Sequence, residues 1–204
     1  MEGSIHNLLL AKIIKGKKGQ IIFPSDFKDL ANTDIIGQTL SRLVKDGKII
    51  RLAHGIYLYP KQDPTLGILY PSTDEIAQAV AQRDKVRIIP TGIDALNKLG
   101  ISTQVPMKAV YLTDGKPKTI KAGKRMIIFQ TSAPKKFAVK GKISSLVIKG
   151  LEALGKNGIT PEVIDRITVA LDKEDKKILK EDAKLAPEWI AQLLFSMTKI
   201  KEHR

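Results

Sequence analysis

NTDIIGQTLSRLVKDGKIIRLAHGIYLYP, residues 32–60, is the stretch of the sequence that most strongly predicts a fold. Its first half places apolar residues at a helical spacing, which predicts a helix over about residues 34–45 with one buried face. Gly47 then supplies the C-terminal cap of that helix. The apolar positions of the buried face are Ile36, Leu40, Leu43 and Val44.

Two β-prone runs follow this helix, at residues 48–52 and 56–59, and a His54-Gly55 turn separates them. Such runs on either side of a glycine turn predict a β-hairpin, which Pro60 ends.

Three shorter elements are predicted upstream. Residues 4–14 have helical apolar spacing with Ser4 as a candidate N-cap, residues 21–23 form a short strand, and Ser25 begins a short second helix. The complete order is helix, strand, helix, turn, helix and hairpin. This order is that of a winged helix-turn-helix, and it is the most specific signal in the sequence.

The rest of the chain predicts a second domain, which begins after a linker at residues 61–71. Asp114-Gly115 is a hairpin signal. We therefore expect an α+β protein, with an N-terminal winged helix-turn-helix (1–60) followed by a mixed α/β domain that ends in a helical bundle (61–204). The further elements expected are helices at 73–83, 91–99, 143–154, 161–171, 173–183 and 187–199, and strands at 86–89, 108–113, 117–121 and 125–131.

The polar side of the 34–45 helix carries short hydrogen-bonding side chains first and cations later. A recognition helix needs this arrangement, because its N-terminal part meets base edges and its later residues meet phosphates. Gln38 can pair bidentately with adenine, and Arg42 with guanine or a phosphate. A solvated helix face in a small bundle is the alternative interpretation. The candidate DNA contacts of this helix are Thr33, Asp34, Gln38, Thr39, Ser41, Arg42 and Lys45.

Further cations flank this helix in the sequence. Arg51 and His54 lie at or near the tip of the predicted hairpin, where a cation can enter the minor groove or contact a phosphate. Lys17 and Lys18, before the first strand, and Lys48, at the start of the hairpin, are placed to contact the DNA backbone. His54 could equally be a turn residue without a ligand. A hairpin directly after the helix favours DNA recognition over the solvated-face alternative.

The charge of the chain also indicates a polyanionic partner. The formal net charge is +14 and the isoelectric point is about 9.8. Neutralising phosphates releases condensed counterions, which favours binding without any reading of base sequence. The positive charge lies in the front and middle of the chain, and residues 116–149 contain ten Lys or Arg and no acidic residue.

Several classes of protein are disfavoured by the composition. The chain has no cysteine, which argues against disulfides and thiolate chemistry and fits a reducing cytoplasm. The N-terminus lacks a signal-peptide pattern, and no segment approaches the ~20 apolar residues of a membrane span. We therefore expect a cytoplasmic protein that has no membrane partner.

Neither an enzyme, a metal site nor a cofactor is expected from the motifs. The three histidines are scattered, and no phosphate-binding loop or nucleophile motif is present. A group of acids alternates with lysines near the C-terminus, which predicts a salt-bridged, solvated helix face. These acids are Asp172, Glu174, Asp175, Glu181 and Asp182.

Three segments of the chain resemble the AbiEi family of antitoxins from type IV toxin–antitoxin systems. They are GKIIRLAHGIYLYP at 47–60, PTGIDALNKLGISTQVP at 90–106 and AVYLTDG at 109–115. The resemblance covers roughly residues 5–150. It implies a winged helix that binds inverted repeats upstream of its own operon and represses transcription. It also implies a second domain that supports antitoxin activity against a nucleotidyltransferase-type toxin, often without a stable complex.

The resemblance further implies that positive patches on the second domain help to hold DNA. Solvated loop positions are the alternative for the lysines of residues 116–149. The candidate residues of this second basic patch are Lys116, Lys118, Lys121, Lys124, Arg125, Lys135, Lys136 and Lys140.

Three other functions remain open at this point. The chain could bind a toxin directly and use its winged helix only weakly, or it could be an orphan regulator with no toxin. RNA binding ranks last, because aromatic residues make up only 5% of the chain and single-strand recognition usually needs aromatic stacking.

Overall fold

The structure is a computed structural model that describes residues 4–104 and 106–202, with side chains throughout except at 135 and 198–202. The chain divides into two compact units. Unit 1 contains the described residues up to Val80 together with Ile120–Arg125, and unit 2 contains Ala81–Thr119 and the described residues from Met126 onward. Helices and mainly antiparallel strands occur in both, so the fold is α+β.

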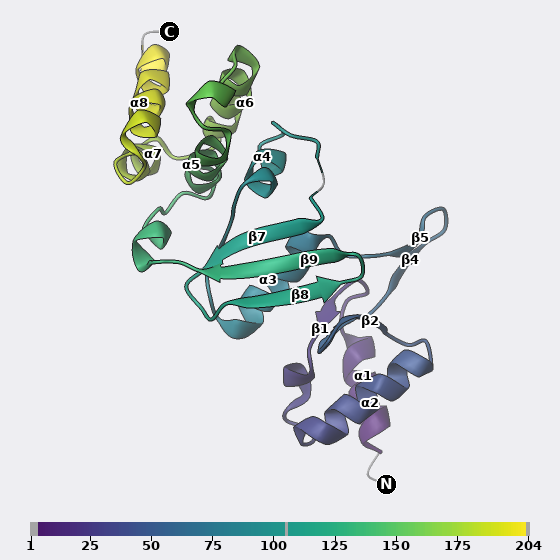
Figure 1. The fold of residues 1–204 in the computed structure, drawn as a ribbon. Helices are drawn as coiled ribbons and strands as arrows, with labels where there is room; N and C mark the ends of the chain where they lie inside the picture. Colours follow the sequence, from purple (N-terminus) through teal and green to yellow (C-terminus); the bar gives the residue numbers. More distant parts are fainter. Residues whose placement is uncertain (1–3, 105, 203–204) are drawn as a thin grey trace. The chain divides into compact units, whose positions relative to one another are not determined.

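Unit 1 begins with the elements expected from the sequence (Figure 1). The predicted second helix is a single 3-10 turn, η1, and the other elements lie within two residues of their predicted bounds. The elements are α1 (Ile5–Lys15), β1 (Ile21–Ile22), η1 (Pro24–Phe27), α2 (Thr33–Lys45), β2 (Ile50–Ala53) and β3 (Ile56–Leu58).

A three-stranded antiparallel sheet in the order β1-β3-β2 closes this part of unit 1. Ile21 pairs with Leu58, and Ile50 pairs with the same residue from the other side. The three helical elements and the sheet share one apolar core, and this burial fixes the helices against one another. The fully or nearly fully buried residues of the core are Leu9, Ile13, Ile22, Phe27, Ile36, Leu40, Leu43, Ile49 and Tyr57.

The segment predicted as a linker, residues 61–71, is instead a second β-hairpin. Strand β4 (Lys61–Asp63) pairs antiparallel with β5 (Gly67–Leu69). Its turn is closed by the Asp63 carboxylate, which accepts hydrogen bonds from the backbone N–H groups of Thr65 and Leu66 at 2.9 Å each. These two bonds lower the pKa of Asp63. Local side-chain bonding therefore orders a stretch whose Pro and Gly content indicated a loop.

Most of unit 2 is a sheet followed by four helices, and the sheet runs in the order β6-β7-β9-β8 (Figure 1). The helix α3 (Thr73–Asp84) precedes it and begins in unit 1. Strand β7 alternates buried and exposed residues, which places Ala109, Tyr111 and Thr113 on its inner face. The bounds of this part are β6 (Ile88–Pro90), α4 (Ile93–Lys98), β7 (Lys108–Thr113), β8 (Lys118–Ala122), β9 (Arg125–Thr131) and η2 (Pro134–Phe137).

The hairpin predicted at Asp114-Gly115 is wrong, because β7 pairs with β9 in parallel and not with β8. Asp114 is engaged elsewhere: its carboxylate accepts bonds from the backbone N–H and the Nε of Arg87, both at 2.8 Å. The side chain of Arg87 is the main cause of a lowered pKa of Asp114. The tight turn lies instead between β8 and β9, where Gly123 has a φ of +61°.

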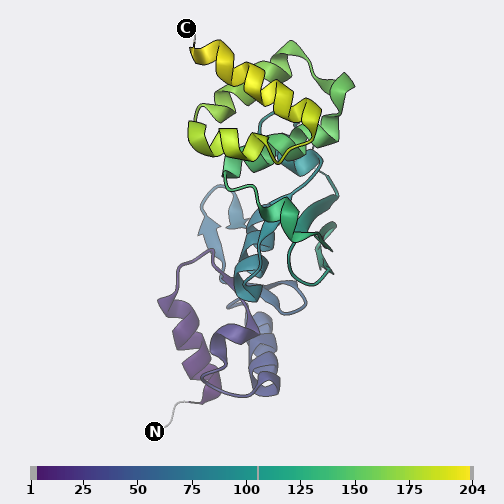
Figure 2. The ribbon, with the colours of Figure 1, turned by 90° about the vertical axis from the view of Figure 1, so that its left-hand side faces the viewer.

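The four C-terminal helices form one group in both views of the ribbon (Figures 1 and 2). Their apolar stripes meet in a common core that includes Val147, Leu151, Ile167, Leu179 and Ile190. The helices are α5 (Lys142–Leu154), α6 (Pro161–Leu171), α7 (Lys176–Ala183) and α8 (Glu188–Glu202), with the short η3 (Lys156–Gly158) between the first two.

Two of the acids expected on a solvated helix face instead hold the start of α5. Glu174 accepts from the backbone N–H groups of Ile143 and Ser144, at 2.8 and 3.1 Å. Asp182 is 1% exposed and accepts from the backbone N–H groups of Lys140 and Gly141, at 2.9 and 2.8 Å. The first amides of a helix have no partner within it, and Glu174 satisfies two of them, while Asp182 holds the backbone of the two residues that lead into α5.

Within the described part of the chain, every helix is too short or too polar to cross a lipid bilayer.

Candidate nucleic-acid interface

The two sides of α2 differ completely in exposure. Ile36, Leu40 and Leu43 are at most 1% exposed and face the core of unit 1. The opposite side is open to solvent along the whole helix. It carries the exposed side chains of Thr33, Asp34, Gln38, Ser41, Arg42 and Lys45.

The N-terminus of α2 is fixed by its own cap. The side chain of Asn32 accepts a hydrogen bond from the backbone N–H of Ile35 at 3.0 Å. Asp34 lies in the first turn, where its negative charge complements the helix dipole. The position of the exposed side chains is therefore set by a capped helix on a packed core and not by a mobile loop.

Thr39 was predicted as a DNA contact but does not belong to this exposed side of α2. Its exposed fraction is 5%. It follows Ile36 by three residues and precedes Leu43 by four, and this spacing turns it toward the core. Ser41 is exposed, but its hydroxyl donates to the carbonyl of Gly37 at 2.9 Å, so it can offer a partner only its acceptor lone pairs.

The hairpin β2–β3 follows α2 after a turn at Gly47, which has a φ of +66°. Arg51 and His54 are both exposed, and the guanidinium Nη2 of Arg51 lies 3.1 Å from Nδ1 of His54. A guanidinium only donates, so Nδ1 of His54 is the acceptor in this bond. The two side chains thus form one cationic unit near the hairpin turn.

The loop that carries Lys17 and Lys18 is tied to the same hairpin. The backbone N–H of Gly19 donates to the carbonyl of Tyr59 at 2.7 Å, and Tyr59 donates to Gln20 at 3.0 Å. Both lysines are exposed, as is Lys48 at the start of the hairpin. The structure therefore brings all the flanking cations of the first prediction into unit 1.

The candidates of the second basic patch are divided between the two units. Residues 120–125, with Lys121, Lys124 and Arg125, group with unit 1, whereas the other candidates belong to unit 2. Arg125 donates to the hydroxyl of Thr73 at 3.5 Å. The remaining candidates of this patch are Lys116, Lys118, Lys136 and Lys140, while the side chain of Lys135 lies outside the described residues.

Lys118 is engaged within its own unit. Its ammonium forms an ion pair with Asp84 and lies 5.2 Å from the ring centroid of Phe129. Burial is the main cause of a lowered pKa of Lys118, and the charge of Arg83 adds to it. Lys140 is more exposed but pairs with Glu181 at 3.2 Å. These two cations interact with acidic side chains of their own unit.

Lys61 was not predicted as a DNA contact, because the composition of the segment after Pro60 indicated a linker. Lys61 is an exposed residue of β4 in unit 1. The signal that could have found it is the spacing Asp63…Gly67, which is typical of a turn closed by an aspartate side chain.

These observations define an α+β protein of two compact units, of which unit 1 exposes a polar and cationic helix face followed by a hairpin. The chain belongs to DUF6088, a family of unknown function, whose model matches residues 9–179. A similar solved structure is that of the RV2827C protein from Mycobacterium tuberculosis, with a TM-score of 0.46 and 10% sequence identity, over 96% of this chain and 82% of that chain. No curated protein matches the chain significantly.

Proposed function

We propose that the chain is a DNA-binding transcriptional repressor and that residues 4–60 act as a winged helix-turn-helix. The observation that carries this proposal is the solvent-open side of α2, with Gln38 and Arg42 at its centre, directly followed by the β2–β3 hairpin. A helix that reads the major groove needs this combination of a buried side, an unobstructed polar side and an adjoining ribbon.

In the proposed complex, α2 enters the major groove with its first turns toward the base edges. Gln38 pairs with an adenine, and Arg42 with a guanine or a phosphate. The Arg51–His54 pair contacts the adjacent backbone or enters the minor groove. Five further exposed cations of unit 1 can contact phosphates: Lys17, Lys18, Lys45, Lys48 and Lys61 of β4.

The resemblance to AbiEi antitoxins supports a more specific proposal. The chain would repress its own operon at an inverted-repeat operator in the cytoplasm, and it would be the antitoxin to a nucleotidyltransferase-type toxin. Family membership assigns no activity, so this part of the proposal depends on the resemblance alone.

A gel-shift assay with the DNA upstream of the gene tests the central proposal. The double variant Gln38→Ala, Arg42→Ala removes the base-reading groups from an exposed surface, so the fold should be unaffected. Each lost bidentate contact removes about 1–3 kcal/mol of discrimination, and we expect the operator and a random duplex to bind almost equally weakly.

The matched control is Gln82→Ala, Lys156→Ala, which removes an exposed amide and an exposed cation from unit 2. This control should bind the operator like the parent chain. Equal and small losses for operator and random DNA in the α2 double variant would show that α2 is not the reading helix.

A direct toxin-binding antitoxin is the second candidate, and the β4–β5 hairpin favours it. Leu66 is 75% exposed and Tyr70 is 63% exposed, so this hairpin presents apolar side chains to solvent. If the hairpin binds a toxin, the double variant Leu66→Ser, Tyr70→Ser should abolish co-purification with the product of the adjacent gene and leave the gel shift intact. Co-purification that is unchanged would remove this hairpin from any toxin interface.

A further inference from the structure

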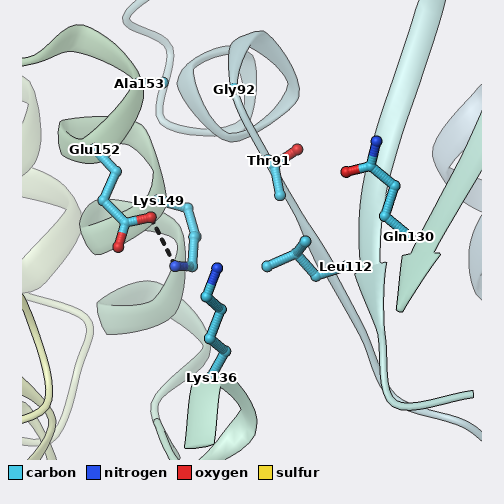
Figure 3. A pocket seen from close by; sticks show the side chains of 8 residues that line it. All are labelled: Thr91, Gly92, Leu112, Gln130, Lys136, Lys149, Glu152 and Ala153. Atoms are coloured by element: carbon cyan, nitrogen blue, oxygen red, sulfur yellow. Dashed lines mark hydrogen bonds and ion pairs between the residues drawn. The ribbon is translucent and has the colours of Figure 1, made fainter. Parts of the chain in front are cut away.

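Unit 2 contains a cavity whose lining residues have no role in the proposed reading of DNA. Its volume is about 290 Å³. It is lined by the connection between β6 and α4, the C-terminal ends of β7 and β9, η2 and α5 (Figure 3). The lining residues are Thr91, Gly92, Leu112, Gln130, Lys136, Lys149, Glu152 and Ala153.

The unusual member of this lining is Lys149, a charged residue of α5 that is only 8% exposed. Burying an ammonium group is costly unless it is paired. Glu152 accepts one of its three N–H groups at 2.7 Å. Of the described residues, only Glu152 accepts a hydrogen bond from this ammonium, so two of its donors remain for another acceptor.

A second ammonium group reaches the same space. Figure 3 shows Lys136 extending from η2 toward the region that Lys149 faces. Two cations and one carboxylate leave a net positive charge in the cavity, and the two ammonium groups repel each other. An anion between them would remove this repulsion. Gln130 lines the other side of the cavity with its side-chain amide.

Both lysines are carried by segments that are held rigidly. Phe137 of η2 is 6% exposed; its carbonyl accepts from Nη1 of Arg87 at 3.2 Å, and its ring lies 5.1 Å from that guanidinium. Arg87 is in turn fixed by Asp114. The start of α5 is fixed by the buried Asp182. A site with prearranged donors loses little entropy when a ligand binds.

We propose that this cavity binds a small phosphorylated molecule, whose phosphate group lies between the ammonium groups of Lys149 and Lys136. A phosphate monoester carries about −1.5 to −2 charges and three terminal oxygens, so it can accept from both ammonium groups and balance both charges better than a singly charged carboxylate. Ligand pockets start at roughly 300 Å³, so the cavity limits its ligand to about the size of a nucleoside monophosphate. Leu112 and Ala153 would contact the organic part.

The test measures ligand-induced thermal stabilisation, because a ligand that binds only the folded state raises the melting temperature in a saturable way. The probes are inorganic phosphate, AMP and acetate, each at constant ionic strength maintained with chloride. The proteins are the parent chain, Lys149→Met, Lys136→Met and the control Lys156→Met, which removes an exposed lysine of the same unit. Lys136 is exposed, so its variant folds even where that of Lys149 does not.

We expect saturable stabilisation by phosphate and by AMP in the parent chain and in Lys156→Met. The apparent affinity should fall about tenfold or more in Lys136→Met and Lys149→Met, since each loses a charged hydrogen bond to the ligand. Stabilisation that is equal in all four proteins would show a diffuse effect of the net charge and would overturn the proposal. If acetate stabilised the parent chain as much as phosphate does, the assignment of a phosphorylated ligand would be wrong.

A short random duplex distinguishes a free phosphate from the phosphate of DNA. If the cavity takes a small molecule, neither lysine variant changes the affinity for this duplex. An equal loss of duplex and phosphate affinity would place the cavity in a DNA interface and overturn the small-molecule assignment. The stabilisation assay contains no operator DNA, so a failure of the proposed reading by α2 would leave its result unchanged.

Discussion

The candidate DNA-contacting cations of unit 1 and three lysines of residues 116–149 look alike in the sequence but differ in their partners. Within the described residues, no acidic side chain pairs with Arg42, Lys45, Lys17, Lys18 or Lys48. In residues 116–149, Lys118 pairs with Asp84, Lys140 with Glu181 and Lys149 with Glu152.

This difference teaches that a count of cations does not locate a binding surface. Residues 116–149 contain no acid of their own, yet three of their lysines have acidic partners: distant segments supply Asp84 and Glu181, and Glu152 lies one helical turn after Lys149. An ammonium already paired within the protein releases fewer counterions when it meets a phosphate. We therefore expect the paired charges of unit 2 to contribute mainly to folding and the unpaired charges of unit 1 to contribute mainly to DNA affinity.

The largest effect should follow removal of a buried charge from unit 2. Asp182→Ala leaves the buried backbone N–H of Gly141 and the part-buried backbone N–H of Lys140 without an acceptor. Each such group costs about 1–3 kcal/mol, so we expect the free energy of unfolding to fall by about 2–5 kcal/mol in urea titrations. At urea concentrations too low to unfold the Asp182→Ala variant, its gel shift should be the same as that of the parent chain.

Glu181→Ala is the matched control, because it removes the adjacent and exposed carboxylate that pairs with Lys140. Exposed pairs contribute about 0–1 kcal/mol, and the stability should hardly change. A similar stability for the two variants would contradict the role of Asp182 at the start of α5.

An intermediate effect should follow removal of unpaired cations from unit 1. The triple variant Lys17→Ala, Lys18→Ala, Lys48→Ala should keep its stability, since all three side chains are exposed. If each lysine contacts one phosphate, the slope of log K against log salt should fall by about 2.7, since the slope is about 0.9 per phosphate. Affinity for operator and random duplexes should fall together.

The corresponding change in unit 2 is Lys118→Ala with Lys140→Ala. Both lysines are paired with acids, so this double variant should leave the salt slope unchanged. A slope that falls as much as in the triple variant would show that paired cations of unit 2 also contact DNA, and the comparison between the units would fail.

The elements of the site could be predicted because they depend on local patterns. The period of Ile36, Leu40 and Leu43 fixes α2, and the two β-prone runs around His54-Gly55 fix the hairpin. The strand predicted at 108–113 matches β7 to the residue for the same reason. Thr39 was also within reach of the sequence, since its spacing from Ile36 and Leu43 places it on the buried side.

Pairings between distant segments could not be predicted in this way. Nothing near Asp114 in the sequence shows that Arg87, 27 residues earlier, holds its carboxylate. The parallel pairing of β7 with β9 likewise depends on the choice between two neighbouring strands, which local propensity does not determine. Glu174 and Asp182 appeared as solvated charges because the N-terminus that they bind lies about 30 to 40 residues away.

The smallest effect concerns the ion pair of Arg87 and Asp114, which is exposed on the arginine side. Arg87 lowers the pKa of Asp114 in the folded chain. A carboxyl group whose pKa is lower when folded stabilises the protein above its unfolded pKa, and this contribution is lost as the pH falls through the folded pKa.

Comparing the parent chain with Asp114→Asn in urea titrations, we expect the parent to be slightly more stable at neutral pH. The difference should shrink as the pH falls below about 4, where the unfolded carboxyl group becomes protonated. A difference that is constant between neutral and acidic pH would show that the pair acts through shape alone. Asp114 and Arg87 would then not count among the paired charges that stabilise the fold of unit 2.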